Sequence, residues 1–269
     1  MQKLYSETSI SNIADAIRAK GGTGTFTVGE MAQAIEDLPS GGGLTIDDVI
    51  NKTFPETVTY SGNKDPVGSL FSGSTTIKHF SAPNMVNLSS SLFSGCSNLE
   101  SVDCPSVTTN NTNITHVFLN CSKLTSVNLP KLRLLGQQAF RNCGFTTVVF
   151  KAMTELRPDA FDDCTHLTGA DFPSLGYTYQ AFMRCTNLNA LVLRRTSAIC
   201  GLANTMIFNN TPFAVGATHS GHIYVPSAMI SSYQTATNWS TFYNDYNDLF
   251  QPIEGSPYEN YYVDGTPIE

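Results

Sequence analysis

The sequence predicts a mainly β solenoid of about six to seven stacked repeats, flanked by a short helical hairpin and a mixed α/β cap. The first observation is a repeated motif, Phe-x-x-Cys-x-x-Leu-x-x-Val-x-x-Pro, which is clearest between Phe118 and Pro130. The second is its period, because successive phenylalanines from Phe71 to Phe182 follow at intervals of 22, 25, 22, 21 and 21 residues. A period in the low twenties is typical of solenoids. The third is the low content of charged residues, 14%, which suits β-rich surfaces better than long solvated helices.

The repeats keep the motif with a few substitutions. Its copies begin at Phe71, Phe93, Phe118, Phe140, Phe161 and Phe182. Ser74 takes the cysteine position of the first copy, the fourth copy lacks one residue after Cys143, and Arg194 replaces the final proline of the last copy. A further, degenerate repeat follows around Phe208. In a solenoid each repeat contacts its neighbours. The copies of the motif, with this further repeat, predict a solenoid over residues 70–226.

Each repeat contains one predicted strand, on the Leu-x-x-Val-x-x-Pro part. Side chains alternate along a strand, so Val127 should point inward and Ser126 and Asn128 outward, before Pro130 ends the strand. The phenylalanines should stack as an aromatic column. Apolar residues after each proline should fill the core from the opposite side: Met85, Val107, Leu132, Met153 and Leu175.

Five of the seven cysteines hold the same position in successive repeats: Cys96, Cys121, Cys143, Cys164 and Cys185. Stacking would align them at about one strand spacing, ~4.8 Å, which is within the range for disulfides. Disulfides and a metal column are therefore open alternatives. However, no Cys-x-x-Cys occurs, and one inward residue per rung favours small buried thiols. We expect free, packed thiols.

Two short helices are predicted ahead of the repeats. Residues 9–20 and 28–38 each carry an apolar face, and each helix is too short to be stable alone in water. They should pair as a hairpin, which makes residues 1–39 a separate attachment module. The Ser-Gly-Gly-Gly segment at 40–43 is a flexible linker. Residues 44–69 then precede the first clear repeat and should cap the unpaired edge of the solenoid.

Residues 227–269 are predicted to close the other end, as a cap with an aromatic tail. The preceding segment from Ile223 to Pro226 has the pattern of a last strand, and Ser227 should cap a helix at about 228–236. An aromatic closure follows, formed by Trp239, Phe242, Tyr243, Tyr246, Leu249, Phe250 and Ile253. Residues 255–269 have no periodicity and are expected to form a tail or an added strand.

Charge and composition exclude two classes of partner. The net charge is −7 and no Lys/Arg cluster is present, which argues against binding of nucleic acid. No apolar run approaches the ~20 residues of a membrane helix, so we expect no membrane insertion. The N-terminal residues, Met1 to Glu7, lack the apolar core of a secretory signal. The chain is expected to stay in the cytoplasm or to leave by another route, such as within an assembled particle.

No arrangement of residues predicts an enzyme. His219 and His222 are close in sequence, but a metal site needs more ligands, so a solvent-exposed loop is favoured. Asp162 and Asp163 are neighbours in a predicted turn, where a solvated turn is favoured over a carboxylate pair for acid–base chemistry. The Gly-x-Ser-x-Gly pattern of a nucleophile elbow does not occur. We therefore expect no catalytic residue, metal ion or cofactor.

The remaining candidate is a surface made of outward strand positions. It comprises Ser101, Asp103, Ser126, Asn128, Thr147 and Asp171. Small side chains leave a shallow face, and its two aspartates and its asparagine can accept hydrogen bonds from a glycan or a protein. A plain solvated sheet face is the alternative. A rival aromatic surface near the C-terminus comprises Tyr243, Tyr246, Tyr258, Tyr261 and Tyr262.

The repeat unit resembles the BspA-like class of leucine-rich repeats over about residues 70–226. That family is found among bacterial surface adhesins and prophage products, so the resemblance implies binding without enzyme activity. Residues 13–20, Ile-Ala-Asp-Ala-Ile-Arg-Ala-Lys, with the second helix and the glycine linker, resemble the N-terminal module of tail or baseplate-associated proteins of Firmicutes phages. The segments at 223–226 and 236–239 resemble the C-terminal closure of the same proteins.

These resemblances predict a non-enzymatic binding and structural protein of a phage or prophage tail, such as a tail fibre. Residues 1–39 would attach it to other tail or baseplate proteins, and the repeats would contact a host cell-surface glycan or protein, giving receptor binding and adhesion. The expected location is the virion tail. The alternative is a bacterial surface adhesin or protein-interaction scaffold at the cell surface. An oligomer stays open, because no heptad segment specifies one.

Overall fold

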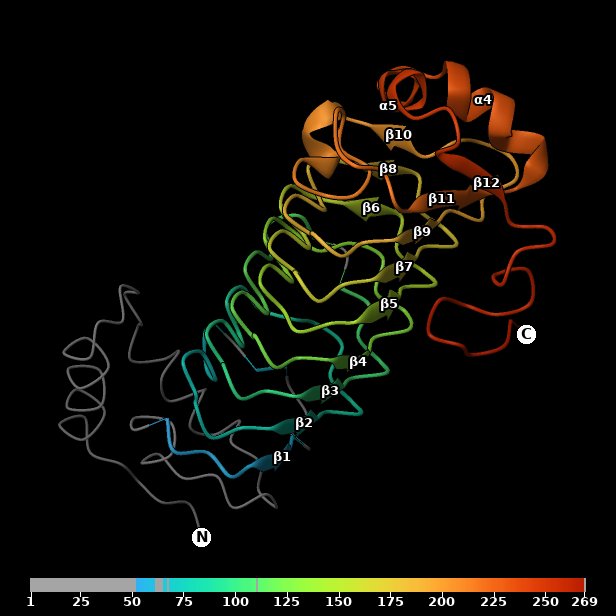
Figure 1. Cartoon of the computed structure of the whole chain (residues 1–269). Helices are drawn as coiled ribbons and strands as arrows, with labels where there is room; N and C mark the ends of the chain where they lie inside the picture. The colour runs from blue at the N-terminus through green and yellow to red at the C-terminus, as the bar shows by residue number, and fades with distance from the viewer. Residues whose placement is uncertain (1–51, 61–64, 67, 110, 269) are drawn as a thin grey trace, which may run out of the picture.

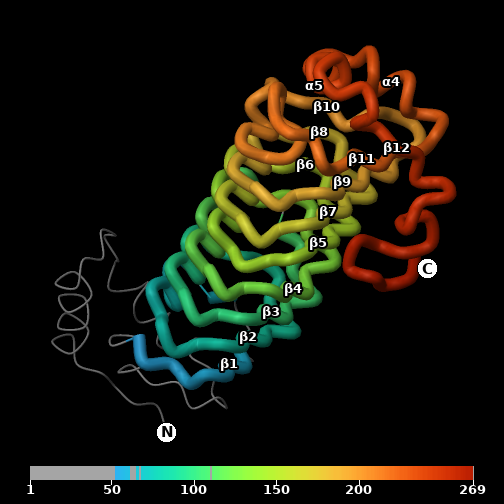
Figure 2. Tube along the Cα trace, in the orientation of Figure 1, coloured from blue at the N-terminus to red at the C-terminus, as the bar shows by residue number. Residues whose placement is uncertain are grey.

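Each repeat forms one turn of a coil, and the strands of successive turns lie one above the next (Figure 1). The computed structural model describes residues 52–60, 65–66, 68–109 and 111–268. The hairpin predicted for 1–39, the linker at 40–43 and the first part of the predicted cap lie outside these described residues. Figure 2 shows turns of similar size stacked along the molecule, with the last part of the chain returning along the strand side. The predicted β solenoid is confirmed.

The strands are short and follow the repeat. On the main strand side they are β1 (Thr57–Thr59), β2 (His79–Ser81), β3 (Ser101–Asp103), β4 (Ser126–Asn128), β5 (Thr147–Val149), β7 (Gly169–Asp171), β9 (Ala190–Val192), β11 (His222–Val225) and β12 (Phe250–Pro252). A second side of the coil carries β6 (Glu155–Leu156), β8 (Tyr177–Thr178) and β10 (Gly201–Leu202). All named strand pairs are parallel, as stacking of one repeat on the next requires.

The main strand side is divided into two sheets. One sheet has the order β1-β2-β3-β4, and the other has the order β12-β11-β9-β7-β5. The division falls at the shortened repeat, where a Cβ added to Gly144 would lie 2.5 Å from the carbonyl oxygen of Ser122. The chain therefore approaches the preceding turn more closely than any side chain would allow. Val127 lies on the edge strand β4 and is only half-buried, less than its inward position predicts.

The predicted phenylalanine column is the centre of the core. Neighbouring rings from Phe71 to Phe182 are nearly parallel, with centroids 5.2–5.7 Å apart. The column extends one turn further, because Phe208 stacks on Phe182 at 6.3 Å. The apolar residues expected after each proline are buried in the core: Met85, Val107, Leu132, Met153 and Leu175. Burial of each aromatic side chain contributes a large share of the stability of its turn.

Five of the seven cysteines form a second buried column beside the rings. All seven are free and buried. In five successive turns the thiol donates to the carbonyl oxygen of the phenylalanine that starts the preceding turn, at 3.0–3.2 Å, namely Cys96 to Phe71, Cys121 to Phe93, Cys143 to Phe118, Cys164 to Phe140, and Cys185 to Phe161. A small side chain that fills the space and satisfies a buried carbonyl explains the position without a disulfide.

The C-terminal part closes the solenoid with helices. They are the 3₁₀ helices η1 (Thr205–Phe208) and η2 (Ser227–Met229) and the α-helices α4 (Ile230–Thr235) and α5 (Trp239–Asp245). Trp239 and Phe242 are buried against Phe208, as the aromatic pattern predicts. The capping role expected for Ser227 is wrong: Pro226 holds the N-cap position of η2, and no side chain caps it. A 3₁₀ turn precedes α4 instead.

The phenylalanine column generates a prediction about stability. Phe118→Ala should lower the free energy of unfolding by about 3–5 kcal/mol, because it opens a cavity between two stacked rings. Urea unfolding followed by circular dichroism measures this loss. Lys123→Ala, on the exposed side of the same turn, is the control and should change stability by less than about 0.5 kcal/mol. Equal effects of the two substitutions would contradict a core built on the ring column.

The thiol column generates a prediction about reactivity. Burial raises the pKa of Cys164 to about 12 and holds the pKa of Cys143 well above its usual value. Because the thiolate is the reactive form, these thiols stay protonated at about pH 8. Iodoacetamide should label none of the seven cysteines of the folded protein and all of them in urea, as counted by mass spectrometry. Rapid labelling under native conditions would show that the thiols are accessible.

Candidate ligand-binding surface

The outward positions of β2, β3 and β4 form an open polar face. Adjacent strands are in register, so Asp103 lies beside Asn128 and Ser101 beside Ser126. Asn128 Nδ2 donates to Asp103 Oδ1 at 2.7 Å, and neither Asp103 Oδ2 nor Asn128 Oδ1 makes a hydrogen bond to another described residue. His79 Nδ1 bonds Ser101 Oγ at 2.9 Å. Hydrogen bonds between rungs thus fix the side chains and leave acceptors pointing outward.

The same face is interrupted beyond β5. Thr147 is half-buried on β5, in the second sheet, and is the last predicted residue that keeps some exposure. Asp171 on β7 is fully buried, so the expectation that it presents a carboxylate to a ligand is wrong. The C-terminal tail after β12 covers this region, and the tail runs beside the strands in Figure 1. A Cβ added to Gly169 would lie 3.2 Å from Val263 of the tail.

Arg194 anchors the tail to the solenoid. Its guanidinium donates to both carboxylate oxygens of Asp171, with Nη2 2.6 Å from Oδ2, and to the backbone carbonyls of Tyr258 and Tyr261 at 2.8 and 3.0 Å. The ring of Tyr262 lies 5.2 Å from the same guanidinium. Burial raises the pKa of Asp171, while hydrogen bonds from Arg194 act in the opposite direction. The arginine that replaces proline in this repeat therefore binds the tail to the solenoid.

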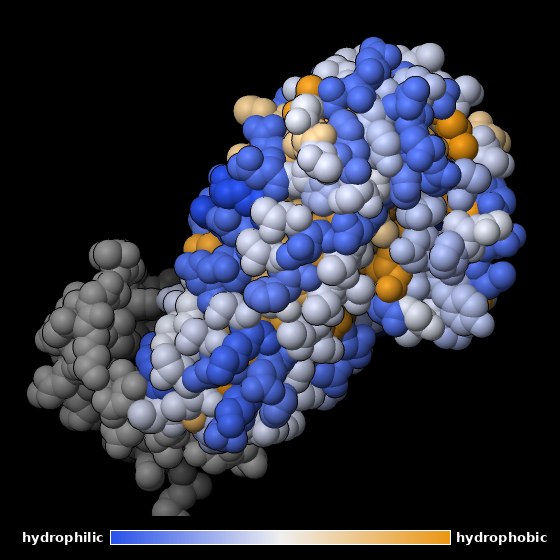
Figure 3. Space-filling view, viewed as in Figure 1, coloured by the Kyte–Doolittle hydropathy of each residue, from blue (hydrophilic) through white to orange (hydrophobic). Residues whose placement is uncertain are grey.

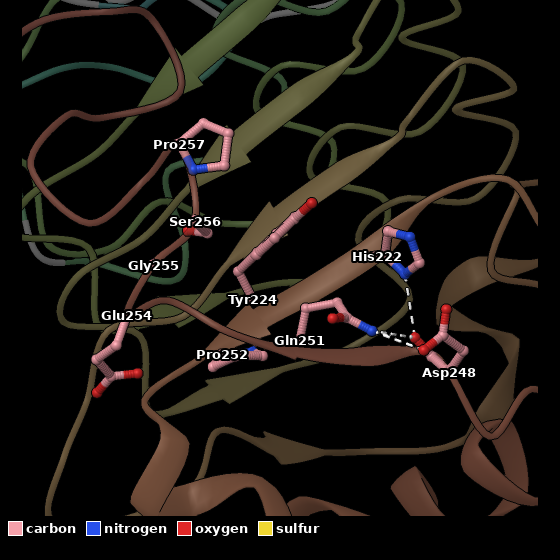
Figure 4. A pocket seen from close by; sticks show the side chains of 9 residues that line it. All are labelled: His222, Tyr224, Asp248, Gln251, Pro252, Glu254, Gly255, Ser256 and Pro257. Carbon is pink, nitrogen blue, oxygen red and sulfur yellow. Dashed lines mark hydrogen bonds between the residues drawn. The ribbon is translucent and has the colours of Figure 1, made fainter.

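A shallow pocket of about 340 Å³ lies at the C-terminal end of the strand side (Figure 4). Its floor is made by outward residues of β11 and β12, because Ile223 and Phe250 point into the core while Tyr224 and its neighbour Gln251 point out. Its walls are made by the following residues: His222, Asp248, Pro252, Glu254, Gly255, Ser256 and Pro257. The volume is at the lower end of the range for small-molecule sites, about 300–1,000 Å³.

Hydrogen bonds hold the polar groups of this pocket. Gln251 Nε2 donates to Asp248 Oδ1 at 2.8 Å, and His222 Nδ1 lies 3.0 Å from the Asp248 carbonyl oxygen. Glu254 Oε2 accepts from the backbone N–H of Ser227 at 2.9 Å. Backbone N–H groups of Glu254 itself and of Ser227 lower the pKa of the Glu254 carboxyl, so it is ionised at neutral pH. The pocket is therefore acidic and its side chains are already oriented.

The structure separates the five tyrosines of the predicted aromatic surface. Tyr258 contacts Tyr224 edge to face at 4.7 Å, and Tyr246 packs beside His222 at 5.9 Å, so each of these two contacts a residue that lines the pocket. Tyr243 packs on the closing layer at Phe250. Tyr261 and Tyr262 lie further along the tail than Tyr258; Tyr262 is buried and Tyr261 is 52% exposed.

His219 and Asp162, which were expected in a solvent-exposed loop and a solvated turn, instead contact other side chains of the protein. His219 Nε2 lies 3.0 Å from Asp245, and its ring stacks on Tyr246 at 4.5 Å. Asp162 is buried and pairs with Arg141 and Arg184, which also bind Asp163. Burial and the neighbouring Asp163 raise the pKa of Asp162. In the part of the chain that the structure describes, no group of three His, Cys, Asp or Glu could hold a metal ion, and no helix is long and apolar enough to cross a bilayer.

Sequence reasoning missed the floor of the pocket. Alternation along the predicted strand at 223–226 places Tyr224 outward, so the sequence could have predicted this part of the floor. No sequence pattern predicts the position of Gln251, because the segment Phe250–Pro252 has the composition of an aromatic closure. In the structure this segment is a strand that pairs with β11. Asp248 and Glu254 flank that strand and acquire their positions from it.

The architecture defines a repeat protein that acts through its surface, because packing occupies the interior. Comparison with protein families matches the BspA type leucine-rich repeat region, in six copies, over residues 52–168 and 111–213. The two segments together span more than half of the 269-residue chain, and the chain belongs to this family. A protein of this kind is suited to binding or scaffolding, and such repeat proteins are typically non-enzymatic.

Solved structures that are similar to the chain include two leucine-rich repeat proteins. One is a leucine-rich repeat protein from Bacteroides ovatus ATCC 8483, with 18% identity and a TM-score of 0.48, over 74% of this chain and 66% of that one. The other is the T. pallidum leucine-rich repeat protein, with 14% identity and a TM-score of 0.35, over 73% of this chain and 86% of that one. The chain thus spans 66% of the length of the first structure. A search of curated proteins found no match.

The tail anchor generates a prediction. Arg194→Ala should destabilise the protein by about 3–5 kcal/mol, because Asp171 would stay buried without its charge partner. The tail should also detach, so that limited proteolysis within residues 255–268 becomes faster than in the parent protein. Arg133→Ala, at an exposed arginine, is the control and should leave the cleavage rate unchanged. If the tail of the Arg194 variant resisted cleavage as the parent does, another contact would hold it.

Proposed function

We propose that the chain is a non-enzymatic binding and structural protein of a phage or prophage tail that contacts a ligand on the host cell surface. The observation that carries the binding role is the open polar face of β2, β3 and β4, where oriented side chains retain unused acceptors above a closed core. Fixed side chains lose little conformational freedom when a ligand binds, which favours affinity.

The surface of the solenoid supports a polar ligand over an apolar one. Figure 3 shows a mostly hydrophilic face on which apolar residues form small, scattered spots. The exposed large apolar side chains of the described part are Val86, Tyr177, Met206, Val215 and Tyr261. Met206 and Val215 share the turn before β11, and the other three lie in separate turns or in the tail. A protein partner that docks through a large apolar patch is therefore disfavoured.

The tail setting rests on the sequence of the flanking segments. Residues 1–39, outside the described residues, resemble the attachment module of phage tail or baseplate-associated proteins. The family match alone fits a bacterial surface adhesin or interaction scaffold equally well. Mass spectrometry of purified particles from a lysate distinguishes the two. Detection of the chain in the particles supports the tail role, and its recovery only from the bacterial envelope supports the adhesin.

The binding role has a direct test. Fluorescently labelled full-length protein should bind host cells, and Asp103→Ala/Asn128→Ala should weaken that binding about tenfold or more, since both are fixed acceptors on the open face. The control, Asn187→Ala/Asn244→Ala, removes two exposed amides away from the strands and should bind as the parent does. Flow cytometry over a concentration series gives the affinities. Equal binding by both double variants would contradict a role for this face.

A further inference from the structure

In the pocket between β11, β12 and the turn at 254–257, most hydrogen-bond donors are already used and several acceptors are free. Its wall donors are already used, because Ser256 Oγ donates to the Ile253 carbonyl at 2.7 Å and Gly255 N–H donates to Glu259 at 3.1 Å. His222 Nδ1 lies 3.0 Å from the Asp248 carbonyl oxygen and 3.2 Å from the Tyr246 hydroxyl, so both contacts use Nδ1 and leave Nε2 without a partner among the described residues. The free groups that remain are therefore mainly acceptors.

Three further acceptors surround the floor. Gln251 and Asp248 use one end of each side chain on the other, and Glu254 uses one oxygen on Ser227. Among the described residues, none donates to Gln251 Oε1 or Asp248 Oδ2. The Glu254 carboxylate accepts from Ser227 and from its own backbone N–H and keeps further lone pairs. A ligand that satisfies this pocket must bring several donors, and two carboxylates exclude an anionic one.

The arrangement of the carboxylates distinguishes two kinds of donor-rich ligand. In Figure 4, Glu254 and Asp248 stand on opposite sides of Tyr224 and Gln251 and do not converge on one point. A single ammonium group is best held by carboxylates that meet at one position. Acceptors spread around a ring suit a ligand whose hydroxyl groups project in several directions.

Tyr224 supplies the remaining part of a sugar site. Its side chain is half-buried, is fixed by the edge-to-face contact with Tyr258, and its hydroxyl makes no hydrogen bond within the described residues. An aromatic ring that is apolar on its face and polar at its tip matches a sugar ring, which has apolar C–H surfaces and polar edges. The rigid contact keeps the ring in place before a ligand arrives.

We propose that this pocket binds a neutral sugar residue of a glycan, with Tyr224 as the platform and Gln251, Asp248 and Glu254 as acceptors for its hydroxyl groups. This inference rests on the proposed binding function and assigns it a ligand class and a second location on the strand side. The pocket is separate from the open face of β2, β3 and β4, because the anchored tail covers β7 and β9 between them.

The test uses the full-length chain on an array of neutral and acidic oligosaccharides, followed by calorimetry with the best neutral oligosaccharide. Tyr224→Ala should weaken neutral-glycan binding about tenfold or more, and Gln251→Ala should weaken it about threefold or more. Tyr177→Ala is the matched control, because Tyr177 is an exposed tyrosine on β8, on another side of the coil, and it should not change the affinity. Thermal unfolding of each variant shows that the fold is retained.

The salt dependence of binding and a cationic peptide probe distinguish a sugar ligand from a basic protein segment. Binding of a neutral glycan should be nearly independent of ionic strength, whereas binding of an oligolysine peptide would weaken as salt rises. Salt-sensitive oligolysine binding that depends on Glu254 and Asp248, without neutral-glycan binding, would overturn the proposal.

Failure of this proposal is distinguishable from failure of the proposed function. If neutral-glycan binding survives Tyr224→Ala and is lost in Asp103→Ala/Asn128→Ala, the chain is a binding protein but this pocket is not its sugar site. If the chain binds host cells yet no neutral glycan on the array, the proposed function stands and the sugar assignment fails.

Discussion

Stacking of a phenylalanine on its equivalent one turn away is the constraint that the rest of the molecule obeys. Parallel strands advance by about 4.8 Å, and the rings follow at 5.2–5.7 Å, so each turn must return its ring to nearly the same place. Changes of repeat length are therefore accommodated outside the column. The shortened turn is tolerated because Gly144 lets the backbone approach Ser122.

This constraint leaves the outward positions and the ends of the solenoid as the parts where residues can vary. The inward positions are filled by rings, thiols and aliphatic side chains that pack against one another. The thiols also donate hydrogen bonds to carbonyl groups of the preceding turn. Outward positions are free to vary from turn to turn, and they differ: acceptors on β3 and β4, small residues beneath the tail, and an aromatic floor on β11. One scaffold thus carries surfaces of different chemistry along a single side.

The repetitive part of the fold was readable from the sequence because identical spacing implies identical packing. The ring column, the strand positions and the buried thiols followed from the motif alone. The sites depended on contacts between distant segments, which spacing does not encode. Arg194 looked like a defect in the motif until the tail was placed on it, and Asp162 looked solvated until two arginines from adjacent turns enclosed it. Tyr224 gained its pocket only when Gln251 paired beside it.

The division between β4 and β5 makes the solenoid asymmetric at that level. The strand side has no ladder linking the two sheets, yet the opposite margin of the same two turns stays bonded, with Phe118 N–H donating to the Ala139 carbonyl at 2.8 Å. Thr154 N–H also donates to the Arg133 carbonyl at 2.9 Å, so these two turns are hydrogen-bonded at two places on the coil and lack a ladder only on the strand side. The polar columns of β3 and β4 and the features beyond β5 therefore belong to one solenoid but not to one sheet, and a ligand that touches both would cross the break in the ladder.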